Sequence, residues 1–469
     1  MDLFSFREIY FIGIKGAGMT ALAELLFRQG IRVSGSDTEE IFYTDAVLRR
    51  LGISVSQPFS AGHIPLSTEA FIYSTAYSQE NNVELREALT TGKPVLSYPE
   101  ALGLLTQQKL TLAVCGTHGK TTTSALLAET LKGIGRDPSA IVGSEIKNWG
   151  GGALAGKGQY LVVEADEYQD KLRFYHPFAA ILTSVDWDHP DFFPDTSSYE
   201  EVFKRFVARI PKHGVLVACG DDARVLSVAR SAVCKVITYG FHADNDVHID
   251  TIRVIDPESA EGKLGLRQSF TLSVTGESYG PFSLRLAGKH NAQNAAAAVA
   301  LLIHLKFSLD NLSESLSAFS GTKRRFEQLG EFQEALVFDD YAHHPDEIRV
   351  TLRAIRELYP KRKLTVVFHP HTFSRTKALL PEFAEALSEA DVVCLLDIYG
   401  SARETHGGVS SLDITERINS IFPAKAQYLP NHQAVLEYLR GAHLSSTDLV
   451  VTMGAGDVWQ VAESLLHSS

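Results

Sequence analysis

The sequence has few cysteines and no long apolar run, and each absence excludes a class of protein. Its four cysteines, Cys115, Cys219, Cys234 and Cys394, form no C-x-x-C pair and follow no metal-ligand spacing. A disulfide scaffold or a cysteine-based metal site is therefore not expected, and the four residues are typical of small apolar core positions in a reducing compartment. No stretch of about 18 consecutive apolar residues occurs, so no segment is expected to span a membrane.

The chain also lacks a secretory leader and an excess of positive charge. Its N-terminus has no basic region followed by an apolar core and a small-residue cleavage site. Lysine and arginine number 44 against 56 aspartates and glutamates, for a formal net charge of −12. Net negative charge repels polyanions, so we expect a protein that binds neither nucleic acid nor a membrane. The missing leader and the scattered cysteines indicate a cytoplasmic protein.

Short apolar strands alternate with helical patterns along most of the chain, which is typical of parallel α/β layers. At roughly 100 to 200 residues per domain, the length predicts about three domains. Polar stretches at 106–109 and 320–323 divide the pattern into three blocks. We therefore predict an α/β protein with domains over residues 1–107, 108–321 and 322–469.

Residues 114–123 read VCGTHGKTTT, between an apolar strand and a helical pattern. A glycine-rich turn at a helix start leaves backbone N–H groups free to bind phosphate, and the helix dipole favours the same anion. Lys120 is expected to reach the β and γ phosphates, and the Thr121 hydroxyl to bind Mg²⁺. The stretch therefore predicts an ATP site. Its predicted contacts are Gly116, Thr117, His118, Gly119, Lys120, Thr121 and Thr122.

A second glycine motif follows the first predicted strand. Gly13, Gly16 and Gly18 form G-x-x-G-x-G before a helix, and Asp37 ends the next strand about 20 residues on. In a dinucleotide-binding fold such an acidic residue binds a ribose hydroxyl. The motif by itself is compatible with an NAD-dependent dehydrogenase, and the ATP loop argues against that interpretation.

Two consecutive strands of the second block end in side chains suited to a metal. YLVVEADE ends in Glu164, Asp166 and Glu167, and VDWDHP ends in Asp188 and His189. Open α/β sheets bind ligands at this end of their strands, and carboxylate oxygens suit Mg²⁺. A solvated charge cluster is the alternative, and the neighbouring ATP loop makes it less favourable.

Later polar motifs point to the rest of a ligand site. In HNAQN, Asn291 and Asn294 lie one helical turn apart, so both amides can read the edge of a base unless one only caps the helix. Arg324 and Arg325 are suited to a bidentate contact with phosphate or carboxylate. Polar side chains also follow two strands of the third block, within DDYAHHP (339–345) and HPHTFSRT (369–376).

Five motifs resemble, in sequence and in order, those of the Mur ligases, the ATP-dependent amide-forming enzymes of peptidoglycan assembly. They are GTHGKTTT, EADE, HNAQN, DDYAHHP and HPHTFSRT. The resemblance covers essentially the whole chain. It implies a Rossmann-like UDP-sugar domain, a central P-loop ATPase domain and a Rossmann-like C-terminal amino-acid domain. It also implies ATP and Mg²⁺ as cofactors and a monomer or weak dimer.

The resemblance further implies the reaction. ATP phosphorylates the carboxylate of UDP-N-acetylmuramate, and the amine of L-alanine attacks the acyl phosphate. The alternative within the family is a recycling ligase that adds the tripeptide L-Ala-γ-D-Glu-meso-diaminopimelate to the same sugar. Outside the family, the dehydrogenase and a non-catalytic ATP-dependent regulator remain alternatives.

Residue roles follow from the same resemblance. The residues implied to be catalytic are Lys120, Glu164, His189, Arg325, His343 and Arg375. Further ATP contacts are His290, Asn291, Asn294, Arg325 and Asp340, and the metal residues are Thr121, Glu164 and His189. The UDP-sugar contacts are Gly16, Ala17, Gly18, Met19, Ser36, Asp37, Ser74 and Thr75. The amino acid is expected to contact Tyr341, His343 and Arg375.

The chain departs from the family pattern at three places. The segment that begins EYQDKLRF at Glu167 replaces a more usual ESD-type sequence, and Thr372 stands where some members carry arginine. Phe203 stands where many members carry a carbamylated lysine, with Lys204 next to it. These departures affect the substrate-facing loop, the amino-acid pocket and the surroundings of the second metal.

Overall fold

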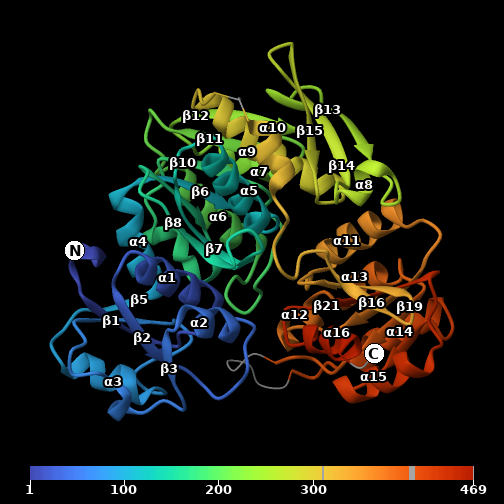
Figure 1. Ribbon diagram of the computed structural model, residues 1–469, viewed down its shortest axis with the longest axis horizontal. Helices are drawn as coiled ribbons and strands as arrows, with labels where there is room; N and C mark the ends of the chain where they lie inside the picture. Colours follow the sequence, from blue (N-terminus) through green and yellow to red (C-terminus); the bar gives the residue numbers. More distant parts are fainter. Residues whose placement is uncertain (309–310, 401–406, 468–469) are drawn as a thin grey trace.

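A computed structural model describes residues 1–308, 311–400 and 407–467, and it contains three sheets with helices packed on them (Figure 1). The sheets have five, ten and six strands and occupy consecutive parts of the chain, residues 8–97, 110–284 and 327–453. The predicted α/β class is confirmed. A search of the described residues for a helix long and apolar enough to cross a bilayer found none.

The first sheet is parallel, with the strand order β3-β2-β1-β4-β5. The order reverses between β1 and β4, and open sheets bind ligands at the carboxyl edge of such a switch point. The strands are β1 (Glu8–Ile12), β2 (Arg32–Ser36), β3 (Ser54–Ser56), β4 (Ala70–Tyr73) and β5 (Val95–Ser97). The helices are η1 (Leu3–Ser5), α1 (Ala17–Arg28), α2 (Asp45–Leu51), η2 (Ala61–His63), α3 (Val83–Thr90) and α4 (Tyr98–Gln108).

The central sheet has the order β15-β14-β13-β12-β11-β10-β6-β9-β7-β8. Its middle strands are parallel, and antiparallel pairs form both edges. The strands are β6 (Leu110–Cys115), β7 (Ser139–Ile146), β8 (Gly151–Ala155), β9 (Tyr160–Glu164), β10 (Ala179–Leu182), β11 (Val215–Cys219), β12 (Lys235–Gly240), β13 (Val247–Val254), β14 (Gln268–Val274) and β15 (Glu277–Leu284). The helices are α5 (Lys120–Gly133), η3 (Tyr168–Phe174), α6 (Thr196–Val207), α7 (Ala223–Ala229), α8 (Ala260–Lys263), α9 (Lys289–His304) and α10 (Leu312–Ala318).

The third sheet has the order β16-β17-β21-β18-β19-β20, and only β16 pairs antiparallel with its neighbour. The strands are β16 (Glu327–Phe332), β17 (Ala335–Asp340), β18 (Lys363–Phe368), β19 (Val392–Leu395), β20 (Ala426–Tyr428) and β21 (Asp448–Met453). The helices are α11 (Pro345–Leu358), α12 (Phe373–Ala378), α13 (Leu380–Leu387), α14 (Ser411–Ile421), α15 (His432–Gly441) and α16 (Trp459–Leu466).

One hydrophobic core runs through the first two sheets, whereas the third sheet has cores of its own. Helix α1 packs against β7 and β8 of the central sheet. Glu24 of α1 is fully buried there and accepts the backbone N–H groups of Gly152 (2.8 Å) and Ala153 (3.1 Å). The first two units are thus packed as one body, and the C-terminal unit joins them through polar contacts and a small apolar cluster around Ala287 and Ala354.

Candidate active site

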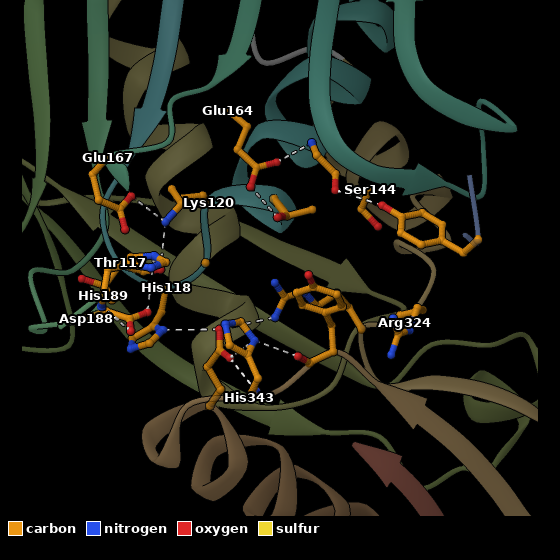
Figure 2. Close-up of a pocket in the computed structure, with 17 residues that line it drawn as sticks. Thr117, His118, Lys120, Ser144, Glu164, Glu167, Asp188, His189, Arg324 and His343 are labelled. Atoms are coloured by element: carbon orange, nitrogen blue, oxygen red, sulfur yellow. Dashed lines mark hydrogen bonds and ion pairs between the residues drawn. The ribbon is translucent and has the colours of Figure 1, made fainter. Parts of the chain in front are cut away.

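A cavity of about 200 Å³ lies where the three parts of the chain meet (Figure 2). Tyr43 lines it from the first part, and the loop after β6 and the ends of the next strands line it from the second. Residues between Arg324 and Glu347 complete it from the third. Five of the six predicted catalytic residues line this cavity, namely Lys120, Glu164, His189, Arg325 and His343.

The predicted phosphate loop joins β6 to α5, and two of its glycines are required by the local geometry. Gly116 has a φ of +131° and Gly119 a φ of +77°, a region that favours glycine. A Cβ atom at Gly116 would lie 2.3 Å from Thr183 Oγ1, and one at Gly119 would lie 2.6 Å from Asn294 Oδ1. Helix α5 begins immediately after this turn, so its N-terminal N–H groups face the cavity side of the loop.

Lys120 is folded over its own loop. Its Nζ donates to the carbonyls of Gly116 (2.5 Å) and Thr117 (3.0 Å) and to Glu167 Oε2 (2.9 Å). Burial lowers the pKa of Lys120, but the charges of Glu167, Asp166 and Glu164 together outweigh burial and raise the pKa above its ordinary value. The amine is therefore charged at the mouth of the phosphate loop, and Glu167 is the partner that sequence reasoning did not identify.

Two of the three predicted metal residues are in contact. Thr121 Oγ1 donates to Glu164 Oε1 (2.7 Å), and the other Glu164 oxygen accepts the N–H of Gly143 (2.6 Å). His189 lines the same cavity, with its ring against Tyr168 at 4.5 Å. A hydroxyl and a carboxylate at a phosphate loop are donors that suit Mg²⁺. The residues therefore fit the predicted ion, and His189 lines the same cavity.

A second cavity of about 260 Å³ adjoins the first and contains the predicted base and ribose contacts. His290, Asn291, Asn294, Arg325 and Asp340 all line it, beside Thr122. Helix α9 begins at Lys289 with Gly288 as its N-cap, so the helix-cap alternative for the asparagines is wrong. Asn291 Nδ2 instead donates to the Ala287 carbonyl (2.7 Å), which orients the amide toward the helix start.

Burial shifts the charge states of two groups in this second cavity. It lowers the pKa of His290 to about 4, so the imidazole is neutral near pH 7. It raises the pKa of Asp340 to about 6, against the opposing charge of Arg325. Asp340 also accepts the N–H groups of Phe326 and Ala342, both at 2.7 Å, and thereby holds the start of the third unit against this cavity.

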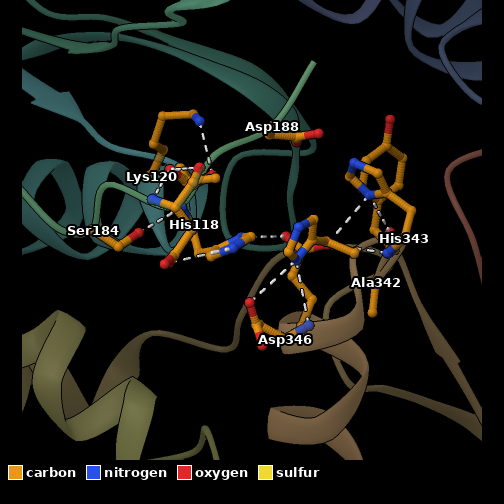
Figure 3. Close-up of polar contacts among 12 residues, drawn as sticks. His118, Lys120, Ser184, Asp188, Ala342, His343 and Asp346 are labelled. Atoms are coloured by element: carbon orange, nitrogen blue, oxygen red, sulfur yellow. Dashed lines mark hydrogen bonds and ion pairs between the residues drawn. The ribbon is translucent and has the colours of Figure 1, made fainter. Parts of the chain in front are cut away.

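Glu347 connects the phosphate loop to the third unit, and sequence reasoning did not single it out. Figure 3 shows His118 of this loop near Asp346 and His343 of the third unit. Its carboxylate lies 3.4 Å from His118 Nδ1 and 3.5 Å from Arg325 NH1, and it accepts the backbone N–H of His343 (3.0 Å). Burial raises the pKa of Glu347, but His343, His118 and Arg325 together hold it well below its usual range. The His344-Pro345 pair was a signal for a helix start that places Glu347 in a first turn.

The sequence predicted that the Arg375 guanidinium binds the carboxylate of the amino acid, and the structure pairs it with Asp188. Its guanidinium is buried and forms two bonds to Asp188, Nε to Oδ1 at 2.9 Å and NH2 to Oδ2 at 3.2 Å. The pair crosses from the central to the third unit. A bidentate arginine–carboxylate pair satisfies the planar fork, so contact between Arg375 and an amino-acid carboxylate requires this pair to open.

The two adjacent arginines have different roles. Arg324 is buried and holds Asp339 (Nε to Oδ2, 3.0 Å) and the carbonyls of Gly454 (2.6 Å) and Gly456 (3.1 Å). Each of its three nitrogens is thus engaged within the protein, although Arg324 also lines the first cavity, so its contact with a phosphate or carboxylate of a ligand stays a prediction. Arg325 remains partly exposed and lines both cavities.

Tyr341 and His343 lie where the sequence placed them, at the cavity wall formed by the third unit. Tyr341 packs against the guanidinium groups of Arg324 and Arg325, at 5.1 and 5.2 Å from the ring centre. His343 Nδ1 lies 3.0 Å from the Tyr341 carbonyl, and burial lowers the pKa of His343 to about 4. His343 is therefore a neutral imidazole at neutral pH.

The predicted UDP-sugar contacts gather at the carboxyl edge of the first sheet, beside the β1–β4 switch point. Some of the side chains in these loops already form hydrogen bonds within the protein. Ser36 is fully buried and bonds Glu84, and Asp37 accepts the N–H groups of Lys15 (2.7 Å) and Thr38 (2.8 Å). These two side chains brace the loop, so direct sugar contact from them stays a prediction.

The unusual segment after Glu167 faces this same edge. It forms η3, in which Gln169 and Asp170 have positive φ angles of 57° and 55°. Gln169 Oε1 accepts the hydroxyl of Thr75, one of the predicted sugar contacts, at 3.0 Å. Lys204 lies elsewhere, ion-paired with Glu200 (3.1 Å) on the outer side of α6, while Phe203 is fully buried.

Three family profiles match the chain in sequence. They are described as the Mur ligase family catalytic domain over residues 8–110, the Mur ligase middle domain over 114–302, and the Mur ligase glutamate ligase domain over 324–456. Together they cover all three sheets. The three-domain α/β architecture expected from the sequence motifs is confirmed by these matches.

Relatives and solved structures agree with the profiles. The chain is 39% identical to UDP-N-acetylmuramate–L-alanine ligase of Desulfitobacterium hafniense (strain Y51), over 98% of this chain and 99% of the relative. It is 35% identical to the protein of the same name from Caldanaerobacter subterraneus, over 100% and 99%. The crystal structure of UDP-N-acetylmuramate-alanine ligase MurC from Thermotoga maritima superimposes with a TM-score of 0.80 at 26% identity, over 98% of both chains. A murein peptide ligase from Psychrobacter arcticus shares the fold, with a TM-score of 0.72 at 24% identity over 98% of both chains.

Proposed function

This chain belongs to the Mur ligase family, and we propose that it joins L-alanine to UDP-N-acetylmuramate in an ATP-dependent step of peptidoglycan precursor synthesis. The observation that carries the proposal is the cavity that brings Lys120, Glu164 and His343 together from distant parts of the chain. Full-length relatives of that name, at 35 and 39% identity, favour this function over the recycling ligase and the dehydrogenase.

The chemistry explains why a phosphate loop belongs in an amide-forming enzyme. A carboxylate cannot expel oxide at neutral pH, so one of its oxygens first accepts the γ-phosphoryl group of ATP, and ADP leaves. The neutral amine of L-alanine then attacks the carbonyl carbon. The bond from this carbon to the phosphate oxygen breaks, phosphate leaves with the electron pair, and the nitrogen loses a proton. Positioning and charge stabilisation supply most of the acceleration in phosphoryl transfer.

Lys120 has the position to stabilise the transferring phosphoryl group. Its charged amine is at the start of α5, beside backbone N–H groups of the same loop. To reach the phosphate, the Lys120 amine gives up its hydrogen bonds to Glu167 and two loop carbonyls and bonds phosphate oxygens instead. His290, Asn291, Asn294 and Asp340 would hold the base and ribose in the adjoining cavity, and Arg325 lies between the two cavities.

We assign Mg²⁺ to Thr121, Glu164 and His189 as its protein contacts. The ion, when bound, neutralises charge on the phosphate oxygens. We further assign residues 1–107 to the UDP-sugar, 108–321 to ATP and 322–469 to the amino acid. In this scheme Tyr341, His343 and Arg375 contact the amino acid. A cytoplasmic location and a monomeric or weakly dimeric state remain predictions from the sequence.

Loss of either proposed metal contact is expected to raise the Mg²⁺ concentration needed for half-maximal activity. Glu164→Ala removes a carboxylate that bonds Thr121, and His189→Ala removes an imidazole that lines the same cavity. Mg²⁺ titration of phosphate release measures the midpoint. His213→Ala, which alters an exposed histidine outside the cavity, is the control. An unchanged midpoint in Glu164→Ala or His189→Ala contradicts the shared metal site.

L-alanine is expected to be the preferred acceptor. Glycine and L-serine should be tolerated, because one methyl or hydroxyl in a small pocket discriminates by only about 1 to 3 kcal/mol. The tripeptide L-Ala-γ-D-Glu-meso-diaminopimelate should react poorly, because Tyr341 and His343 would limit the space that its second residue needs in the cavity. The measurement is kcat/KM for each acceptor with UDP-N-acetylmuramate. A higher value for the tripeptide would make the enzyme the recycling ligase.

A further inference from the structure

Three side chains that take no part in the proposed reaction converge at the carboxyl edge of the third sheet. His369 follows β18, Asp457 follows β21 after a glycine-rich turn, and His432 is the first residue of α15. His432 Nε2 lies 3.1 Å from Asp457 Oδ1, and His369 Nδ1 lies 3.2 Å from the same oxygen. The three potential ligand atoms all lie within 4.8 Å of one another.

The buried histidine of this group approaches Asp457 without forming a well-aligned hydrogen bond. His369 is 7% exposed, and its Nδ1 has no hydrogen-bond partner among the described residues although a carboxylate oxygen lies 3.2 Å away. A buried polar atom left without a partner costs free energy and needs another explanation. The His369 nitrogen and the Asp457 oxygen form an ion pair when the histidine is protonated, and the same separation also places them as two ligands of one ion would be placed.

The spacing also has the right size. Ligands bound to zinc at 2.0 to 2.1 Å in a tetrahedron lie about 3.3 Å from one another. The two nitrogen–oxygen separations of 3.1 and 3.2 Å are close to that value. Two imidazole nitrogens with one carboxylate oxygen suit zinc and similar transition metals, whereas Mg²⁺ and Ca²⁺ prefer sites in which most ligands are oxygens.

We propose that His369, His432 and Asp457 form a site for a divalent transition metal, with zinc as the best fit, separate from the Mg²⁺ contacts of the phosphate loop. Three protein ligands leave a fourth position for water. Such an ion would tie together the ends of β18 and β21 and the start of α15. The inference does not depend on the proposed reaction.

The site adjoins the framework of the amino-acid side of the cavity. Asp457 directly follows the Gly454–Gly456 turn, and the carbonyls of both glycines accept hydrogen bonds from Arg324. The His369 ring lies 5.4 Å from that of Tyr399, which stacks on His371. A metal here is therefore in a position to hold the Gly454–Gly456 turn, and these three ligands act as positioning residues.

A second group of the same kind, His118, His344 and Asp346, lies within the active site already described. His118 belongs to the phosphate loop, and its Nδ1 is engaged with Glu347. This group carries no separate proposal. It does provide a competing location for a transition metal, which the experiment must distinguish.

The test uses the full-length chain, freed of metal by a chelator and kept in excess Mg²⁺. Co²⁺ is titrated and followed by its visible absorption, which is intense for four-coordinate cobalt, and Zn²⁺ is then added as a competitor. We expect one Co²⁺ per chain with a four-coordinate spectrum, displaced by Zn²⁺. Asp457→Asn and His432→Gln should each weaken binding by at least about tenfold, since even the loss of an outer-shell partner costs that much.

Two control variants locate the ion. His443→Gln alters an exposed histidine just beyond α15 and should leave the affinity unchanged, and His344→Gln should do the same. Circular dichroism verifies that each variant is folded. Equal affinity in the parent, Asp457→Asn and His432→Gln overturns the proposal, as does loss of binding in His344→Gln alone. A six-coordinate cobalt spectrum in the parent also overturns it, and this result needs no variant.

Discussion

Replacing Lys120 with alanine is expected to lower turnover by about 10²- to 10⁴-fold, by analogy with the removal of one preorganised electrostatic donor. The amine is charged, buried and held at the phosphate loop by Gly116, Thr117 and Glu167. Without it, the charge of the transferring phosphoryl group loses its nearest protein cation. Single-turnover formation of ADP measures this step directly.

Lys132→Ala is the matched control for this substitution. Lys132 lies in the last turn of the same helix, is about half exposed and pairs only loosely with Glu129. Its loss should change turnover by less than about threefold, since surface substitutions rarely change the free energy of unfolding by more than about 0.5 kcal/mol. Turnover of Lys120→Ala within that same range, in a folded protein, would show that this loop does not bind the reacting phosphates.

Replacing Arg375 with methionine is expected to destabilise the protein by about 3 to 5 kcal/mol, because it leaves the carboxylate of Asp188 buried without its counter-charge. Burial raises the pKa of Asp188, but Arg375, with smaller contributions from His189, His344 and His343, holds it well below its ordinary value. The stabilisation is therefore complete above the unfolded pKa of about 3.9 and is lost as pH falls through the lower folded pKa. Urea unfolding at pH 7, followed by tryptophan fluorescence, measures the loss.

Arg353→Met is the control, since Arg353 is exposed and pairs with Glu389 on the surface. Exposed pairs contribute about 0 to 1 kcal/mol. Asp188→Asn and the double variant complete a cycle that isolates the pair. If the loss in Arg375→Met is no larger than in Arg353→Met, the buried pair does not stabilise the interface.

The same variants separate the two roles considered for Arg375. A guanidinium that also takes the carboxylate of L-alanine should make Arg375→Met raise KM for L-alanine. Asp188→Asn keeps the guanidinium and frees it, so its KM should stay near that of the parent or fall. Equal increases in both variants would assign Arg375 only to the interface with Asp188.

Local features of the site were predictable from the sequence. The phosphate loop needs glycines where φ is positive and where Thr183 and Asn294 approach, and those needs are met within eight consecutive residues. Glu164 was predicted as a metal contact because it directly ends a buried strand. Strand, turn and helix are contiguous in such motifs, so sequence order alone determines which atoms face the ligand.

The sequence did not show which partners far along the chain each charged side chain would have. The sequence predicted arginines free for ligands, yet Arg324 holds Asp339 and Arg375 holds Asp188 across two domains. It did not anticipate Glu347 or the pairing of Lys120 with Glu167. A charged side chain has many chemically equivalent partners, and only the docking of domains selects one.

The amino-acid sequence by itself determined the α/β class, the ATP loop, the strand-end polar residues and the family, because each of these is written in contiguous periodicity or in motifs of fixed spacing. Only the tertiary structure decided that the first two sheets share one core while the third keeps its own. It alone also decided that His369, His432 and Asp457 meet. These three residues lie on separate elements with no common period, so their convergence depends on the strand order of the sheet and the packing of α15 beside it.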